Sequence, residues 1–324
     1  MPCVLGFDGG GTKTDCVAMD RAGNIIARSR SGPSNPMCVG VEASVSALRH
    51  AAQSAVGEFH AISSSRTLQD PLQNTDDRAV LAICAGLAGT GNKDSADTVR
   101  RGLVAAFPGI PVKICTDLEI ALAAVPETPA IVLIAGTGSA AMGRDNSGRI
   151  ERAGGHGPKI GDEGSAYDIG QSAIRAAKRD SEQTGQHSNL AKQILHHAGC
   201  ADWSQWKERP RPAPGELFPQ LFPIVAATAD AGDETAQAIL RRATEQLAAL
   251  VAILVGNLAL RGVPFYLAKF GGMIGRSSFF DSHLDLRLLE VAPRATIGFL
   301  PISPAEAAAR LALQLISRPE ETGN

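Results

Sequence analysis

The feature that most constrains this chain is a glycine-rich hairpin that occurs twice. In the first copy an apolar strand ends at Asp8 and runs into residues 9–13, which read GGGTK. About 125 residues later a second apolar strand runs into residues 136–139, which read GTGS. At the same offset, an Asp-to-Gly turn follows each copy, at residues 20–25 and 145–150. Each copy therefore predicts strand, glycine turn, strand, tight turn and strand, which indicates an internal duplication.

Adjacent glycines in such a turn are typical of a phosphate site. A residue without Cβ lets the backbone N–H groups come close to an anion, and this offsets the conformational entropy that glycine costs. Residues 9–13 are not a Walker A loop, because the spacing is wrong and a strand follows. Residues 136–141 match GxGxxA, but a hairpin signal follows where a dinucleotide fold needs a helix. The two turns together predict polyphosphate binding and phosphoryl transfer.

Two aspartates stand next to these turns. Asp8 ends the first strand, and we interpret it as a Mg²⁺ ligand acting through water, with an Asx-type turn as the alternative. Asp117 follows a predicted strand at 112–115 and precedes a predicted helix at 118–125, so it could be only a helix N-cap. Its place just before the second hairpin favours a general base that accepts a proton from an attacking hydroxyl. Phosphoryl transfer needs mainly positioning and charge neutralisation, so one base with Mg²⁺ is sufficient.

Two further segments are rich in glycine. Residues 154–165 (GGHGPKIGDEGS) precede a predicted helix and are interpreted as a binding loop, although Asp162 and Glu163 could simply favour the helix N-terminus. His156 has no metal-ligand spacing around it, so no metal is expected there. A strand at 265–270 leads into Gly271-Gly272, a weaker signal for an adenosine lying against backbone.

Composition restricts the class of protein. A length of 324 residues predicts about two domains. The net charge of −2 gives no basic field for nucleic acid or anionic lipid, and the apolar run at 247–260 is too short to span a membrane. The chain opens on a strand rather than a signal peptide, so a cytoplasmic protein is expected. Six cysteines without a CxxC pair predict no disulfide, zinc site or iron–sulfur cluster.

The alternation of strands and helices predicts mixed α/β layers. We expect an N-terminal domain at residues 1–129, completed by a C-terminal helix at 303–324, and a second domain at 130–302. Residues 63–77 are expected to be a loop, and residues 207–214 an exposed connection. Helices are predicted at 41–56, 96–107, 166–179, 189–197, 222–229, 234–260 and 304–316, and further strands at 79–85 and 112–115.

The motifs, in this order along nearly the whole chain, resemble those of the BadF/BadG/BcrA/BcrD ATPase family, and in particular its N-acetylglucosamine kinases. This family belongs to the sugar-kinase/heat-shock-chaperone/actin superfamily. The resemblance implies an α/β fold with two ribonuclease-H-like (actin-like ATPase) domains around a nucleotide cleft. It also implies an ATP-dependent kinase that uses Mg²⁺ and phosphorylates the 6-hydroxyl of an amino sugar, most simply N-acetylglucosamine.

The resemblance also implies roles for single residues. Asp117 would be the catalytic base and would also contact the sugar, and Asp8 would hold Mg²⁺. The phosphate-binding residues would be Gly10, Gly11, Thr12, Lys13, Gly136, Thr137 and Gly138, with Gly271 and Gly272 in the adenosine motif. The remaining sugar-binding residues would be Asn35, Ser139, Gly155, His156, Gly157 and Asp162.

Several alternatives stay open. N-acetylglucosamine kinases commonly have Trp where this chain has His156, so N-acetylmuramate or glucosamine could be the substrate. A BadF-type ATPase that activates a dehydratase or reductase is a different class, but it needs cluster-binding cysteines, and only Cys200 follows residue 130. A non-catalytic, actin-like scaffold is the third. The expected partner is a small sugar rather than nucleic acid or membrane, and a homodimer is the default oligomer.

Overall fold

The computed structural model describes residues 2–63 and 80–317, with side chains described at 2–57 and 80–317. The chain forms two compact units. Unit 1 comprises Met1–Pro126 and Leu300–Asn324, and unit 2 comprises Glu127–Phe299. Among the described residues, no helix is both long enough and apolar enough to cross a membrane.

Unit 1 is built on a five-stranded sheet with the order β3-β2-β1-β4-β5. Strand β2 is antiparallel to β1 and β3, whereas β4 and β5 are parallel to β1. This is the arrangement expected of a ribonuclease-H-like domain. The parallel strands bring their carboxyl ends to one edge of the sheet, where ligands of open α/β sheets bind. The strands are β1 (Cys3–Gly9), β2 (Thr14–Asp20), β3 (Ile25–Ser31), β4 (Val80–Leu87) and β5 (Val112–Thr116).

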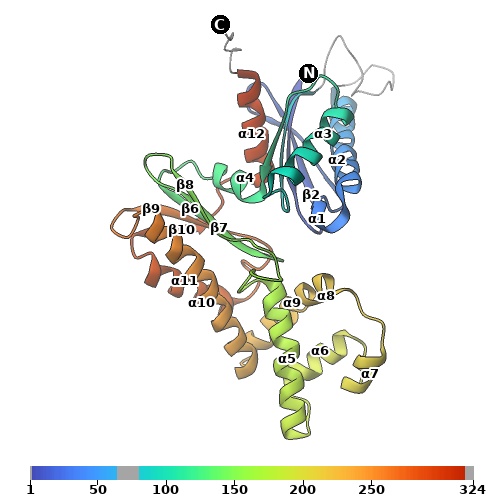
Figure 1. Ribbon diagram of the computed structural model, residues 1–324, viewed down its shortest axis with the longest axis vertical. Helices are drawn as coiled ribbons and strands as arrows, with labels where there is room; N and C mark the ends of the chain where they lie inside the picture. The colour runs from blue at the N-terminus through green and yellow to red at the C-terminus, as the bar shows by residue number, and fades with distance from the viewer. Residues whose placement is uncertain (1, 64–79, 318–324) are drawn as a thin grey trace. The chain divides into compact units, whose positions relative to one another are not determined.

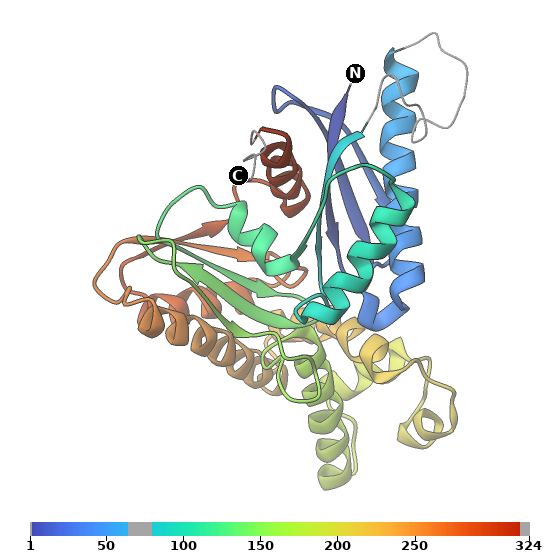
Figure 2. The same cartoon turned by 45° about the horizontal axis from the view of Figure 1, so that its top comes forward.

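Helices cover both faces of this sheet (Figures 1 and 2). Alternate residues of β1 point to opposite faces, so Leu5 and Phe7 pack against α2 and α3 while Val4 packs against α4 and α12. Helix α12 lies directly on β1, because a Cβ on Gly6 would come within 2.1 Å of the Ala309 backbone nitrogen. The helices are α1 (Pro36–Val39), α2 (Val41–Ser63), α3 (Lys93–Ala106), α4 (Asp117–Ala123) and α12 (Pro304–Ser317).

Unit 2 repeats the same sheet. Its order is β10-β9-β6-β7-β8, with β7 antiparallel to β6 and β8, and with β9 and β10 parallel to β6. As in unit 1, a glycine turn follows the central strand, and the next two strands continue the sheet on one side in antiparallel pairing. The predicted duplication of the hairpin is thus confirmed as a duplication of sheet topology. The strands are β6 (Ala130–Ala135), β7 (Ser139–Arg144), β8 (Ile150–Gly154), β9 (Phe265–Phe270) and β10 (Ala295–Phe299).

The helices of unit 2 form one large core with its sheet. Ile131 and Leu133 of β6 pack with Leu247 and Val251 of α10, and α11 runs beside α10 (Figure 1). The helices are α5 (Ala166–Thr184), α6 (Asn189–His197), α7 (Trp203–Glu208), α8 (Pro214–Gln220), α9 (Phe222–Asp230), α10 (Glu234–Asn257) and α11 (Ser278–Val291).

Some sequence predictions need correction. The connection expected at 207–214 is shorter, because its two ends belong to α7 and α8. Four helices, α1, α7, α8 and α11, and strand β10 were not predicted. The loop expected at 63–77 lies outside the described residues, except that Ser63 ends α2.

Candidate functional site

In unit 1 the β1–β2 turn lies at the carboxyl end of the central strand. The Gly10 N–H donates to the Lys13 carbonyl at 2.9 Å, which closes the turn. The Gly10 carbonyl accepts from the N–H groups of Ser34 and Asn35, at 3.0 and 3.1 Å. The fold thereby brings the backbone of Asn35 against the first glycine turn.

The three glycines of this turn are not equivalent. A Cβ on Gly9 would lie 2.1 Å from the Ser34 hydroxyl, so packing alone demands glycine there. A Cβ on Gly10 or Gly11 would meet nothing closer than 3.9 Å, and neither residue has a positive φ. Within the described part of the chain, the N–H groups of Gly11 and Thr12 donate to no protein acceptor. These two glycines leave open backbone that an anion can approach.

Asp117 is the first residue of α4 and half-buried. The N-cap is its neighbour Thr116, which forms a capping box with Glu119: the Glu119 N–H donates to the Thr116 hydroxyl, and the Thr116 N–H donates to the Glu119 carboxylate. The Asp117 carboxylate accepts from the Leu118 N–H at 3.0 Å. The alternative reading of Asp117 as the cap is therefore wrong.

Asp8 and Asp117 act on each other electrostatically. Burial, together with the negative charges of Asp117 and Asp15, raises the pKa of Asp8 to about 7, against the opposing charge of Lys13. Two carboxylates that disfavour each other's charge would both be stabilised by a cation bound between or beside them. In the described residues no group of three or more His, Cys, Asp or Glu side chains could enclose a metal. The pair fits Mg²⁺, which is usually held by one or two carboxylates together with waters and substrate phosphates.

The other predicted residues of unit 1 have clear neighbours. The Asn35 carboxamide oxygen accepts from the Met37 N–H at 2.9 Å and caps α1. A Cβ on Gly89 would lie 2.2 Å from the same oxygen, so Asn35 is held against the chain that follows β4. The Lys13 ammonium lies 2.6 Å from the Asp15 carboxylate and is exposed.

In unit 2 the β6–β7 turn is closed in the same way. The Gly136 N–H donates to the Gly138 carbonyl at 3.0 Å. The first amides of α5, on Ala166 and Tyr167, donate to the carbonyls of Gly136 and Thr137, at 2.9 and 3.4 Å. Across the described residues, the N–H groups of Thr137 and Gly138 have no protein acceptor. Helix α5 thus holds the carbonyl side of the turn, and the amide side stays open.

Asp162 is the most unusual residue of the site. It is buried, yet its φ of 62° lies in the left-handed region that Asp adopts only at some cost. Its carboxylate accepts from the Ser139 N–H at 3.4 Å and lies against Gly138. Burial raises the pKa of this carboxyl. A buried acid in a strained backbone, directly beside the glycine turn of unit 2, indicates a functional position.

Ser139 ties the loop at 154–165 to β7. Its hydroxyl donates to the Glu163 carbonyl at 2.7 Å, and its carbonyl accepts from the Gly155 N–H at 3.0 Å. Gly155 and Gly157 have φ values of 73° and 82°, which favour glycine. His156 between them is exposed. The structure therefore brings the predicted sugar-loop residues of unit 2 together around Ser139.

The late glycines lie against the same turn. Gly271 has a φ of 123°, and a Cβ there would lie 2.2 Å from the Ala135 carbonyl. A Cβ on Gly136 would be 3.7 Å from the Gly272 nitrogen, so the two glycine segments are neighbours. The predicted glycines at 136 and 271–272 thus lie together at the carboxyl ends of β6 and β9.

Sequence reasoning missed one loop of unit 1. The Ala88 N–H donates to the Gly9 carbonyl at 2.9 Å, and the Thr90 hydroxyl bonds the carbonyls of Leu87 and Cys115, at 2.7 and 3.1 Å. This loop joins the ends of β1, β4 and β5. Its signal was present, because residues 86–91 read GLAGTG directly after a buried strand.

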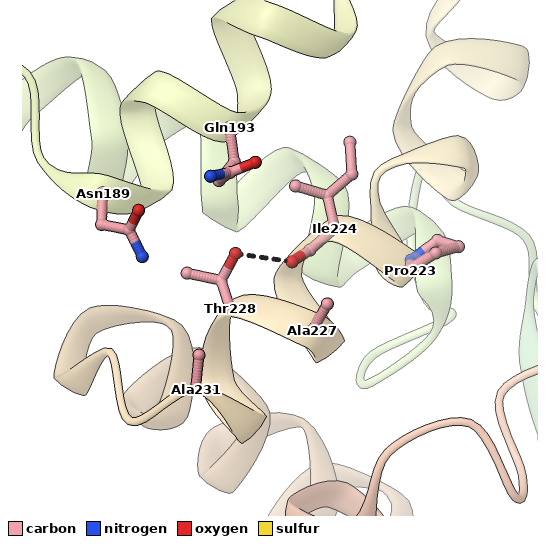
Figure 3. Close-up of a pocket in the computed structure, with 7 residues that line it drawn as sticks. All are labelled: Asn189, Gln193, Pro223, Ile224, Ala227, Thr228 and Ala231. Carbon is pink, nitrogen blue, oxygen red and sulfur yellow. Dashed lines mark hydrogen bonds between the residues drawn. The ribbon is translucent and has the colours of Figure 1, made fainter.

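A pocket of about 400 Å³ lies elsewhere, between α6 and α9 of unit 2 (Figure 3). The Thr228 hydroxyl in its wall donates to the Ile224 carbonyl at 2.7 Å. None of the residues predicted for the site lines it, and its lining carries no charged side chain, so it offers no phosphate or metal chemistry. The lining residues are Asn189, Gln193, Pro223, Ile224, Ala227, Thr228 and Ala231.

Comparison with known proteins agrees with this geometry. A model of the BadF/BadG/BcrA/BcrD ATPase family matches residues 5–293. An N-acetyl-D-glucosamine kinase of Dictyostelium discoideum is 29% identical over 318 residues, which cover 95% of this chain and 97% of the relative. An N-acetylmuramic acid/N-acetylglucosamine kinase of Clostridium acetobutylicum is 29% identical over 286 residues, covering 86% and 88%. The solved structure of a candidate N-acetylglucosamine kinase from Chromobacterium violaceum has a TM-score of 0.76 at 26% identity, covering 97% of this chain and 99% of that one.

Proposed function

The chain belongs to the BadF/BadG/BcrA/BcrD ATPase family, and we propose that it is an ATP-dependent kinase of amino sugars. The reaction is transfer of the γ-phosphoryl group of ATP to the sugar 6-hydroxyl. N-acetylglucosamine is the foremost substrate, because both curated relatives carry it in their names. N-acetylmuramate is the second, because the Clostridium acetobutylicum relative is named for it as well.

The observation that carries the proposal is the pair of open glycine turns, one in each unit. Each presents two exposed or half-exposed residues whose N–H groups have no acceptor among the described residues, Gly11 and Thr12 in one turn and Thr137 and Gly138 in the other. Backbone amides of this kind bind phosphate oxygens and stabilise charge that develops on them during transfer. Gly10, Lys13 and Gly136 complete the phosphate-binding set.

Asp117 is assigned as the general base. Its half-buried carboxylate stands at the carboxyl end of β5 and can accept the proton of a sugar hydroxyl as the oxygen attacks. Asp8 would hold Mg²⁺, which neutralises phosphate charge when bound. The carboxylate repulsion between Asp8 and Asp117 supports a cation at this place.

The other site residues bind the two substrates. Gly271 and Gly272 are assigned to the adenosine portion of ATP, since they lie beside the Gly136 turn. The sugar is assigned to Asn35 in unit 1, and in unit 2 to the loop that Ser139 anchors. The residues of that set are Ser139, Gly155, His156, Gly157 and Asp162. We propose a cytoplasmic location for the protein, because ATP is abundant there.

The test is a coupled ADP-release assay with a panel of N-acetylglucosamine, N-acetylmuramate, glucosamine and glucose. We expect ADP release that depends on an N-acetylated amino sugar, with a 6-phosphate as the product by mass spectrometry and NMR. ADP release that no sugar stimulates would contradict the proposal.

An activator of a dehydratase or reductase is the competing class. Such a protein binds an iron–sulfur cluster through several thiolates. Unit 2 contains one cysteine, Cys200, which is buried. A brown, iron-containing purified protein would favour the activator, whereas a colourless kinase excludes it.

A further inference from the structure

The loop at residues 271–277 joins β9 to α11. Its first residues are held by a hydrogen bond to β6. Met273 is buried, and its N–H donates to the Ala135 carbonyl at 3.2 Å. Ala135 immediately precedes the Gly136 turn, so the loop and the phosphate turn share one anchor. Gly272 and Arg276 of the loop stay exposed.

The middle of the loop is held by the helix that follows it. The Gly275 N–H donates to both carboxylate oxygens of Asp281, at 3.1 and 3.0 Å. Asp281 lies in the first turn of α11. Gly275 has a φ of 76°, so the carboxylate holds the point where the loop reverses direction.

The end of the loop is held from a helix 47 residues earlier in the chain. One carboxylate oxygen of Asp230, the last residue of α9, accepts from the Ser277 hydroxyl at 2.9 Å and from the Phe279 N–H at 2.9 Å. It also accepts from the Ser278 hydroxyl at 3.2 Å. Ser277 in turn caps α11 by accepting from the Phe280 N–H. Although burial works against it, these hydrogen bonds hold the pKa of Asp230 below its usual range.

We propose that Asp230 and Asp281 are positioning residues for the nucleotide, which hold the 271–277 loop in the shape that receives the adenosine portion of ATP. The inference rests on the proposed function. A loop that is already ordered costs little conformational entropy when a ligand binds, whereas a loosened loop has to be ordered by the ligand. Both carboxylates act through the loop and need not touch ATP.

The competing explanation is that the two aspartates only stabilise α11. Asp233 provides the matched control, because it caps α10 by accepting from the Ala236 N–H at 2.9 Å and, within the described part of the chain, makes no hydrogen bond or ion pair with the loop. We would compare Asp230→Ala and Asp281→Ala with Asp233→Ala in the full-length protein. Each variant loses a helix-terminal carboxylate, but only the first two lose a bond to the loop.

Three measurements separate the explanations. The Kd for ATP, by calorimetry, is expected to rise about tenfold in Asp230→Ala and Asp281→Ala and to stay unchanged in Asp233→Ala. The KM for ATP should rise with it, while kcat and the KM for the sugar change less than about twofold. Hydrogen exchange of the peptide covering 271–279 should accelerate in the two loop variants alone. Asp230→Asn keeps an acceptor oxygen and should restore most of the affinity.

The outcomes are distinct. Unchanged ATP affinity in both loop variants, or an equal loss in Asp233→Ala, overturns the inference. Absence of ATP binding by the wild-type protein overturns it as well. If ATP binds tightly and depends on Asp230 and Asp281, but no sugar is phosphorylated, the positioning role stands and the proposed function fails.

Discussion

A Cβ atom on Gly138 would lie 2.9 Å from a carboxylate oxygen of Asp162. The glycine turn of unit 2 and the buried acid of the neighbouring loop are therefore in direct contact, because a residue without Cβ leaves space for the carboxylate. Because a carboxylate is the end of a side chain, an added methyl group would displace it rather than prevent folding.

Gly138→Ala is expected to lower kcat/KM for the amino sugar by about 10- to 100-fold, the usual effect of misplacing a group by about 1 Å. The melting temperature should change little. Asp162→Asn is the companion variant, because it keeps the acceptor for the Ser139 N–H and removes only the charge. Wild-type kcat/KM in Gly138→Ala would show that the position of Asp162 does not matter for catalysis.

Gly9 and Gly10 should respond oppositely to alanine. Gly9→Ala forces a methyl group against the Ser34 hydroxyl and Leu87 side chain, and overpacking of this kind costs about 1–3 kcal/mol in the free energy of unfolding. Gly10→Ala has room and should change that free energy by less than about 1 kcal/mol, yet weaken ATP binding. Urea unfolding and ATP titration measure both. Equal destabilisation of the two variants, or normal ATP affinity in Gly10→Ala, would contradict the role of the first turn.

Asp117→Asn is expected to leave ATP binding intact and to lower kcat by at least about 10²-fold, because an amide cannot accept the proton. Glu119→Gln is the matched control two residues away. It weakens the capping box with Thr116 and should cost up to about 1 kcal/mol of stability, without a comparable loss of turnover. Near-normal kcat in Asp117→Asn would remove this residue from the mechanism.

The raised pKa of Asp8 predicts how stability depends on pH in metal-free protein. The carboxyl has a pKa of about 7 when folded and an ordinary value of 3.8. The native state therefore holds the proton more tightly, so this group's contribution is complete below pH 3.8 and is lost as the pH rises to about 7. Relative to Asp8→Asn, the wild-type protein should lose stability between about pH 4 and pH 7. Unfolding by urea in EDTA measures this, and a pH-independent difference between the two proteins would refute it.

Much of the fold could be predicted because the central strand of each unit, β1 or β6, is a short apolar run that leads into a glycine turn. The duplicated hairpin predicted the two sheets, and the helical spacing of residues 41–56 and 304–316 predicted α2 and α12. Helix α11 was not predicted because residues 284–291 (LDLRLLEV) largely alternate apolar and charged side chains, a pattern that also suits a strand. Strand β10 is five residues long and only partly buried, so its signal was weak.

The site was predictable in its residue types but not in its contacts. The capping box of Thr116 and Glu119 has a local spacing, so the sequence contained the evidence that Asp117 is not the cap. By contrast, Asp162 meets Gly138 only after the chain has formed β7, β8 and a loop. Likewise, Asp230 reaches Ser277 across 47 residues and two intervening elements, which no local pattern reveals.

Helix α12 belongs to unit 1 but is made after all of unit 2. While a ribosome synthesises residues 127–299, the strand face that carries Val4, Val17 and Met19 has no α12 to cover it. At typical elongation rates this lasts roughly 10 to 35 seconds. The nascent protein therefore emerges with an open apolar surface on its first half, and any message cut short before Pro304 would leave that surface bare for the lifetime of the product.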